Sequence, residues 1–172
     1  MSKAHDKPER PQTKGSELFL RADEKWDKGE YRAAFRLFLA SAKAGDVGAQ
    51  VNLGYFYDKG IGIRPSRFKA LYWYRRAFRR GDASAANNIG TIWRDEQNPK
   101  LALLWFEKAV LLGDEGSNLE IAKHYLREGN VPKAIGFLNK VCGSQSISEA
   151  DMEEAKLLLK KAKKTPSKKG PE

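Results

Sequence analysis

The chain has 172 residues, 41% of them hydrophobic and 10% aromatic, which is the composition of a globular domain with a buried core. Its apolar runs are too short to cross a membrane, and its single cysteine, Cys142, excludes a disulfide framework within the chain. The formal net charge of +10 favours anionic partners. Because the chain has one thiol and no apolar signal segment near its start, the sequence predicts a cytoplasmic protein.

The first predicted element follows a polar leader. Residues 1–15 carry charges and prolines, and we expect them to be disordered. A first helix pair is expected over residues 16–45, where Trp26-Asp27-Lys28-Gly29 matches Tyr57-Asp58-Lys59-Gly60 further along the chain. This match is the first sign of an internal repeat.

A Gly-Asp dipeptide then recurs at residues 45–46, 81–82 and 113–114. After each dipeptide, a small, a large, a small and an aromatic residue recur at the same offsets: Ala49, Leu53, Gly54 and Tyr57; Ala85, Ile89, Gly90 and Trp93; Ser117, Ile121, Ala122 and Tyr125. This spacing is one face of an α-helix. Before each dipeptide, alanine and then bulky residues mark a second amphipathic helix. We expect the glycine to end that helix and the aspartate to cap the next one.

The repeats therefore predict an all-α fold built from helix pairs. Further pairs are expected over residues 46–81, 82–113 and 114–143. One pair is too small to bury its own apolar face, so stacking of neighbouring pairs has to form the core. A C-terminal capping helix is expected over residues 147–163, opened by a capping box from Ser148 to Asp151, and a disordered basic tail over residues 164–172.

The helix pair expected over residues 46–81 carries a family pattern that ends in the following Gly-Asp. The pattern comprises Ala49, Leu53, Gly54, Tyr57, Gly60, Gly62, Ile63, Lys69, Ala70, Trp73, Tyr74, Ala77, Gly81 and Asp82. This pattern resembles the Sel-1-like repeat, a relative of the tetratricopeptide repeat, and the resemblance covers roughly residues 16–143. It implies a right-handed α-α superhelix, or solenoid, of about four antiparallel helix pairs plus the capping helix. It also implies a non-enzymatic adaptor that binds a protein or peptide in a concave groove.

Residues that could suggest ligand binding or catalysis have structural explanations in this sequence. Gly60-Ile61-Gly62 follows a predicted helix and lacks the strand of a phosphate-binding loop, so we expect a turn with positive φ. His124 occupies a packing position of the repeat, and the aromatic side chains of the second helices are expected in the core: Trp73, Tyr74, Trp105 and Phe106, with Trp93 of a first helix. The sequence predicts no catalytic site, no metal site and no cofactor.

The resemblance implies that the first helix of each pair lines the concave face. The register places the partner-binding residues in three rows, which contain Arg21, Glu24, Val51, Asn52, Tyr55, Asn87, Asn88, Thr91, Glu120 and Lys123, with Leu20 and Leu119 in the first row. In tetratricopeptide relatives, an asparagine at the register of Asn52 and Asn88 often grips a peptide backbone. The same role is implied here, with a plain polar surface as the alternative.

A second hypothesis comes from the uneven charge. A basic strip is expected on an outer helix face, with no acidic residue three or four positions away within the same helix, and comprises Lys69, Tyr72, Arg75, Arg76, Arg79 and Arg80. Such a strip is either a solvated face or a site for an acidic protein surface or nucleic acid. With the lysine-rich tail, it makes electrostatic binding of a polyanion the alternative function.

Overall fold

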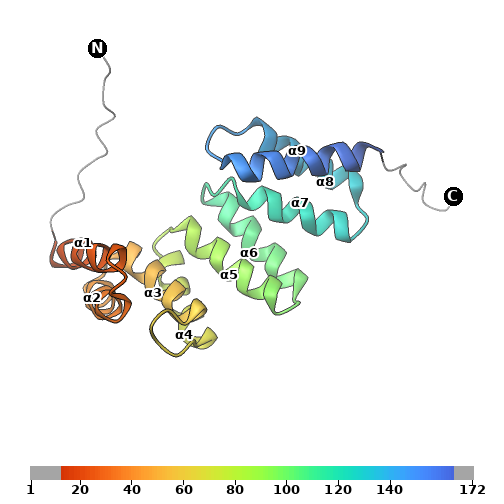
Figure 1. Cartoon of the computed structure of the whole chain (residues 1–172). Helices are drawn as coiled ribbons and strands as arrows, with labels where there is room; N and C mark the ends of the chain where they lie inside the picture. The colour runs from red at the N-terminus through yellow and green to blue at the C-terminus, as the bar shows by residue number, and fades with distance from the viewer. Residues whose placement is uncertain (1–12, 165–172) are drawn as a thin grey trace, which may run out of the picture. The chain divides into compact units, whose positions relative to one another are not determined.

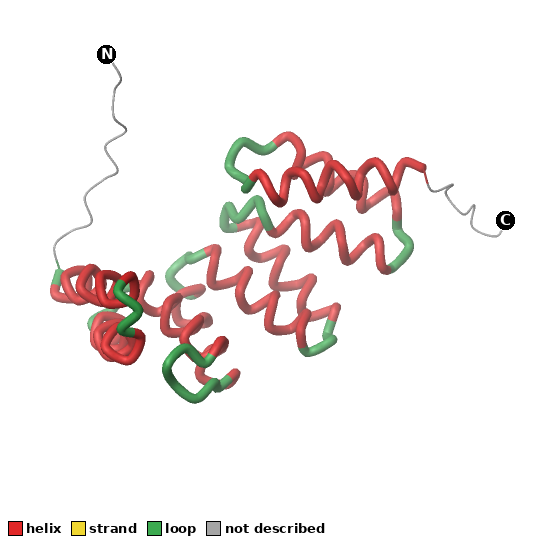
Figure 2. Tube along the Cα trace, in the orientation of Figure 1, coloured by secondary structure: helices red, strands yellow, loops and turns green. Residues whose placement is uncertain are grey.

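The computed structural model describes residues 13–164. Residues 1–12 and 165–172 lie outside this range, and with them most of the predicted leader and tail. The described part is helical, without strands (Figures 1 and 2). Its helices are α1 (Lys14–Asp27), α2 (Tyr31–Lys43), α3 (Val47–Lys59), α4 (Arg67–Phe78), α5 (Ala83–Asp95), α6 (Pro99–Leu111), α7 (Ser117–Arg127), α8 (Val131–Gly143) and α9 (Glu149–Lys164).

Consecutive helices pack as pairs, which are α1 with α2, α3 with α4, α5 with α6, and α7 with α8. The chain divides into two compact units, one over residues 1–80 and one over residues 81–172. In the first unit α2 packs on α3, and in the second α6 packs on α7 and α8 on α9, so pairs stack within each unit. The predicted all-α fold of stacked helix pairs is confirmed. No helix between residues 13 and 164 is long and apolar enough to cross a lipid bilayer.

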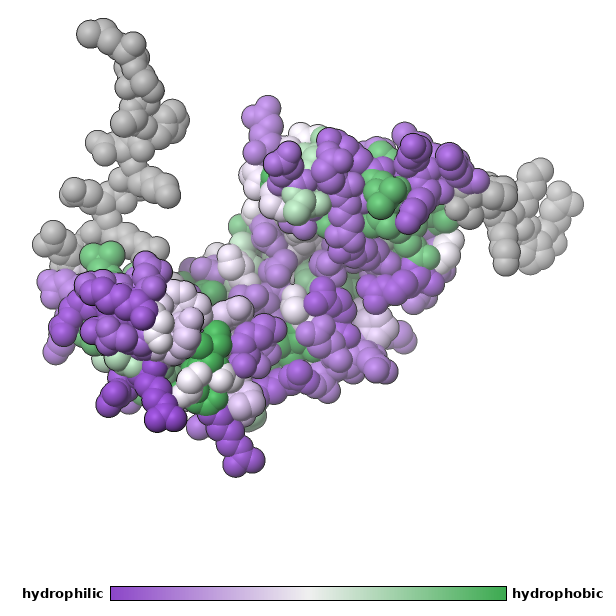
Figure 3. Space-filling model, viewed as in Figure 1, coloured by the Kyte–Doolittle hydropathy of each residue, from purple (hydrophilic) through white to green (hydrophobic). Residues whose placement is uncertain are grey.

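Each unit has its own apolar core. Phe38, Leu53 and Phe56 are buried together in the first unit, and Trp73 joins them. In the core of the second unit, one cluster surrounds Phe106 and Ile121 and another joins α7, α8 and α9. Trp73, Tyr74 and Phe106 are buried as expected, and Trp93 is partly buried against the cluster that contains Phe106. Trp105 is also partly buried, with the Lys108 ammonium over its ring. Hydrophilic side chains cover most of the surface in view (Figure 3).

The small residues of the repeat allow the paired helices to approach closely. A Cβ atom placed on Gly54 would lie 2.4 Å from Cε1 of Tyr74, and one on Gly90 would lie 2.7 Å from Cδ1 of Phe106. Both aromatic side chains are buried on the second helix of the same pair. Only glycine therefore fits at these two positions as the rings now lie.

Caps and turns follow the sequence at most junctions. Asp46 and Asp82 accept hydrogen bonds from the backbone N–H of the third residue beyond, at 2.8 and 2.7 Å, and so cap α3 and α5. Gly60 and Gly62 have φ of 69° and 64°, which confirms the predicted turn. Ser148 accepts a hydrogen bond from the Asp151 N–H and donates one to its carboxylate at the start of α9.

The prediction that Asp114 caps the next helix was wrong. Helix α7 begins only at Ser117, after a tight turn in which the Ser117 and Asn118 N–H groups bond to carbonyls three residues back. The Asp114 carboxylate instead accepts a hydrogen bond from the Ser117 hydroxyl. Two helix ends also differ from expectation, because α1 begins at Lys14, two residues before the expected start and with Thr13 as its cap, and α9 continues to Lys164.

We expect Gly54→Ala to lower the free energy of unfolding by about 1–3 kcal/mol, because the added methyl group displaces the buried Tyr74 ring. Urea unfolding followed by circular dichroism measures this change. The matched control is Gly136→Ala in α8, where no atom lies within 4 Å of the added Cβ. This control should raise stability by up to about 1 kcal/mol. A Gly54→Ala variant as stable as Gly136→Ala would contradict the close-packing argument.

Candidate functional site

A polar hollow of about 340 Å³ opens on the first-helix face of the second unit. Asn87, Asn88 and Thr91 reach it from α5, and Glu120 reaches it from α7. Asp151 of α9 also lines it. The structure thus brings together four of the residues that the repeat register assigned to the partner-binding face. We call this space the α5–α7 hollow.

The two adjacent asparagines of the α5–α7 hollow have different roles. The Asn87 amide donates hydrogen bonds to the Asp114 carboxylate at 2.9 Å and to the Ser117 hydroxyl at 2.8 Å. It therefore fastens α5 to the start of α7. The Asn88 side chain forms no hydrogen bond with any residue of the described part, although it is partly buried and lines the hollow. Its donor and acceptor are available to a ligand.

Arg94, which the sequence analysis did not select, belongs to an ion-pair network with Glu120 at its centre. It pairs with Glu120 at 2.8 Å, and Lys123 pairs with Glu120 at 3.1 Å and with Glu154 at 2.9 Å. The network joins α5, α7 and α9 across the second unit. Glu120 and Lys123, predicted as partner contacts, already have partners within the protein.

The network fixes the charge state of Glu120. Burial alone raises the pKa of this carboxyl, but the hydrogen bonds and positive charges of Arg94 and Lys123 outweigh burial and hold the pKa below its usual range. Burial lowers the pKa of the Lys123 ammonium, but the hydrogen bonds and negative charges of Glu154 and Glu120 outweigh burial and hold this pKa above its usual range. The site therefore keeps fixed charges at neutral pH.

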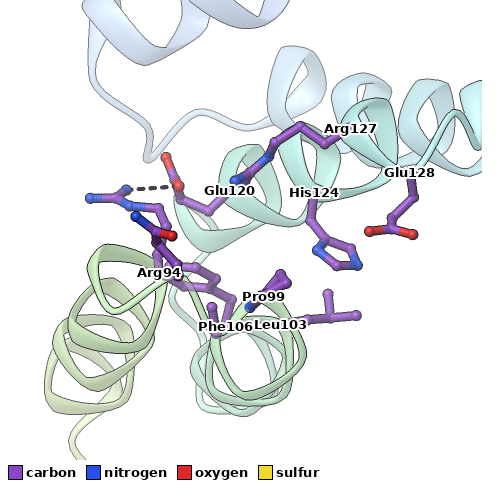
Figure 4. Close-up of a pocket in the computed structure, with 10 residues that line it drawn as sticks. Arg94, Pro99, Leu103, Phe106, Glu120, His124, Arg127 and Glu128 are labelled. Carbon is purple, nitrogen blue, oxygen red and sulfur yellow. Dashed lines mark hydrogen bonds and ion pairs between the residues drawn. The ribbon is translucent and has the colours of Figure 1, made fainter.

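A second hollow, of about 290 Å³, lies on the other side of the Arg94–Glu120 pair. Figure 4 shows Arg94 of α5 reaching Glu120 of α7, while the His124 side chain points from α7 toward α6. Leu103 and Phe106 give this hollow an apolar floor, and Arg127 and Glu128 lie at its charged rim. The predicted packing position of His124 is thus partly buried beside a cavity.

The first unit has a smaller hollow of about 250 Å³ between α1 and α3, which we call the α1–α3 hollow. Asn52 and Tyr55 line it with Asp23 and Trp26, and the rings of Trp26 and Tyr55 lie 6.2 Å apart. Tyr55 is 41% exposed. Within residues 13–164, the Asn52 amide has no hydrogen-bond partner, as is the case for Asn88. The two asparagines share one position of the repeat.

Apart from Leu119, which contributes to the wall of the α5–α7 hollow, the other predicted surface residues do not join these hollows. Arg21 and Glu24 are exposed on α1, where Glu24 pairs with Lys28 at 2.6 Å, and Val51 is partly buried on α3. Leu119, expected on the surface with Leu20, is instead only 2% exposed, because it packs in the core of α7, α8 and α9. All members of the basic strip are exposed on α4 and just after it: Lys69, Tyr72, Arg75, Arg76, Arg79 and Arg80.

Metal-ligating side chains and the single cysteine are the remaining candidates for a chemical role. Among the described residues, no group of three or more His, Cys, Asp and Glu side chains is arranged to hold a metal ion. Cys142 is a free, partly buried thiol that packs against the core of α7, α8 and α9. The hollows therefore offer hydrogen-bonding and charged groups for recognition.

The geometry agrees with comparison to known proteins. Residues 27–46, 47–82 and 83–114 match the Sel1 repeat, and together these matches cover more than half of the chain. The chain belongs to the Sel1 repeat family. The resemblance identified from Ala49 to Asp82 is therefore confirmed, and the pair formed by α7 and α8 follows the matched residues.

Similar proteins include a sel1-like repeat-containing protein of Acanthamoeba polyphaga mimivirus, 33% identical over 86 residues. The match covers 50% of this chain and 16% of the viral protein, so the chain spans about a sixth of that relative. A Sel1 repeat protein from Oxalobacter formigenes shares the fold, with a TM-score of 0.72, 24% identity and coverage of 92% of this chain and 68% of that one. A protective antigen of uropathogenic Escherichia coli with an SLR fold gives a TM-score of 0.73, 23% identity and coverage of 86% and 33%.

We expect Asn87→Ala to lower the free energy of unfolding by about 1–2 kcal/mol, because it removes the amide that joins α5 to Asp114 and Ser117. Asn88→Ala, the neighbouring control, should change stability by less than about 0.5 kcal/mol. Chemical unfolding of both variants and the wild type tests this contrast. Equal losses in the two variants would contradict the assignment of separate roles.

Acid should weaken the fold through Glu120. Because the folded-state pKa lies below the unfolded one, the ionised carboxylate stabilises the fold above about pH 4.3, and this stabilisation disappears as the pH falls through the folded-state pKa. Between about pH 5 and pH 3, the wild type should lose about 1 kcal/mol more than Glu120→Gln. Unfolding curves at each pH measure the difference. The control is Glu107→Gln, which removes an exposed carboxylate from α6 and should keep the acid dependence of the wild type. If Glu120→Gln loses as much stability between these pH values as Glu107→Gln does, the prediction is contradicted.

Proposed function

We propose that the chain is a non-enzymatic protein-interaction scaffold whose first-helix faces bind an extended segment of a partner protein. The observation that carries this proposal is the repeated placement of Asn52 and Asn88. Each lines a hollow beside a neighbouring first helix, and neither amide is used within the described fold. Membership of the Sel1 repeat family supports the same function, since such repeats generally form protein-interaction scaffolds.

An asparagine amide is suited to a peptide backbone because it donates and accepts hydrogen bonds at the same time. A backbone peptide group presents one N–H and one C=O, and an extended segment leaves both free. In the complex, the peptide group would therefore replace the water molecules that otherwise hydrogen-bond to the Asn88 and Asn52 amides. Such contacts recognise the backbone of a segment, not its side chains.

Side-chain selection would come from the surroundings of each amide. In the α1–α3 hollow, the Trp26 and Tyr55 rings offer apolar surface, with the Asp23 carboxylate at the same hollow. This combination favours an apolar residue next to a basic one. In the α5–α7 hollow, Thr91 and the fixed charges of Arg94 and Glu120 favour polar residues. The two hollows thus favour different kinds of side chain.

A selection from a random-peptide library displayed on phage tests the proposal. Peptides retained by the wild-type chain should bind the Asn52→Ala/Asn88→Ala double variant at least about tenfold more weakly, since each lost hydrogen bond contributes about 1 kcal/mol. In nitrogen-15 correlation spectra, the side-chain NH₂ signals of Asn52 and Asn88 should shift when peptide is added. Unfolding midpoints of the variants show whether the fold is retained.

Asn139→Ala is the matched control, because Asn139 is exposed on α8, a second helix of its pair. This variant should bind the selected peptides as the wild type does. Peptides that bind the double variant with unchanged affinity would overturn the proposal. A selection that returns no peptide specific to the wild-type chain would also count against it.

A further inference from the structure

The outer face of α4 combines exposed aromatic rings with unpaired cations. Phe68 is 83% exposed and Tyr72 is 51% exposed. At 100° per residue, both lie in one sector of roughly 120° with four exposed cations on and just after the helix. We call this set the α4 stripe, and it comprises Phe68, Lys69, Tyr72, Arg75, Arg76 and Arg79. Phe68 was not part of the basic strip recognised in the sequence, and its exposure changes the character of this face.

The cations of the α4 stripe have no anionic partner within the described part of the chain. Helix α4 contains no acidic residue, and no ion pair joins Lys69, Arg75, Arg76 or Arg79 to a carboxylate between residues 13 and 164. By contrast, Arg94, which lines the α5–α7 hollow, and Lys123 on α7 are paired with glutamates. The positive potential of the stripe is therefore available to an external anion.

Aromatic rings hold two of these cations in place. The Arg76 guanidinium carbon lies 5.7 Å from the Trp73 ring centroid, and its Nη1 donates a hydrogen bond to the Tyr72 hydroxyl at 3.4 Å. The Lys69 ammonium lies 5.2 Å from the Tyr57 ring centroid. Side chains that are already oriented lose less conformational freedom on binding. The stripe is thus partly preorganised for a ligand.

We propose that the α4 stripe binds single-stranded nucleic acid. Such a strand presents phosphates and flat base faces in each repeating unit, and these match the guanidinium groups and the exposed rings. A duplex hides its base faces in the stack, so it leaves Phe68 and Tyr72 without a partner. Phe68 and Tyr72 are separated by about 6 Å along the helix axis. This separation exceeds the ~3.4 Å repeat of a stacked strand, so bases that rest on both rings must be unstacked.

An acidic protein surface fits the stripe less well. Specific protein interfaces usually place apolar side chains at a central patch and charges at its rim. Here Phe68, Tyr72 and the arginines follow each other along one ridge, without a surrounding apolar patch on α4. A ligand that alternates flat and anionic groups along its length matches such a ridge. Recognition by stacking and charge predicts little dependence on base sequence.

Fluorescence anisotropy with the full chain tests the proposal, using fluorescein-labelled oligouridylate and oligothymidylate of about 15 nucleotides. Both strands should bind, and the logarithm of affinity should fall linearly with the logarithm of salt concentration. Phe68→Ala/Tyr72→Ala should weaken binding by about fivefold or more with the salt slope unchanged, because it removes stacking. Arg75→Ser/Arg79→Ser should reduce the slope by about 1.4, or about 0.7 for each lost phosphate contact.

The charge-matched control is Arg36→Ser/Lys43→Ser, which removes two exposed cations from α2 and should leave the salt slope unchanged. Polyglutamate of equal charge and a duplex of equal length are the competing ligands. The proposal is overturned if either binds as tightly as the single strands, or if Phe68→Ala/Tyr72→Ala binds like the wild type. Absence of binding at low salt, or an equal loss in the α2 control, also overturns it. Circular dichroism confirms that each variant remains folded.

Discussion

The contact between an aromatic side chain on one helix and a glycine on its pair sets the geometry of each unit. Tyr74 occupies the space that a side chain at Gly54 would need, and Phe106 does the same at Gly90. Asn52 and Asn88 lie two residues before these glycines, about 200° around the helix. The contact that buries each glycine therefore turns the asparagine to the opposite side. In this way the packing of the core directs the two amides toward the hollows.

Neighbouring residues on the same helix have different roles because their side chains leave the helix in different directions. Asn87 is turned about 100° from Asn88, and this turn directs it toward the start of α7. There it donates to the Asp114 carboxylate, which also accepts a hydrogen bond from the Ser117 hydroxyl, so these side chains bond to one another and α7 begins without a side-chain cap. The network around Glu120 adds a second connection between the same helices. The α5–α7 hollow is thus bounded by fixed groups, with Asn88 left available.

The first and second helices of the repeat carry two different kinds of surface. On the first helices, amides and paired charges favour directional hydrogen bonds, which depend weakly on salt. On α4, unpaired arginines and exposed rings favour charge attraction and stacking, which depend strongly on salt. The same repeat produces both, because its sequence pattern constrains only the buried face and leaves the outer positions free to differ. The excess positive charge of the chain is therefore compatible with a scaffold that also binds a polyanion.

The sequence alone determined the features that depend on local geometry. Glycine at positive φ, aspartate caps before α3 and α5, and the 3.6-residue period of the apolar face each follow from a few adjacent residues, so helix pairs and most core side chains were predictable. The Thr13 cap was local as well, but the prediction began at Ser16. Tertiary structure decided the roles of Asn87, Glu120 and Leu119, and revealed Arg94 and the exposed Phe68. Whether such a side chain finds a partner depends on residues about one repeat away, such as Ser117 for Asn87. Spacing along one helix defines the direction of a side chain, whereas the groups it meets there depend on how the next helices pack.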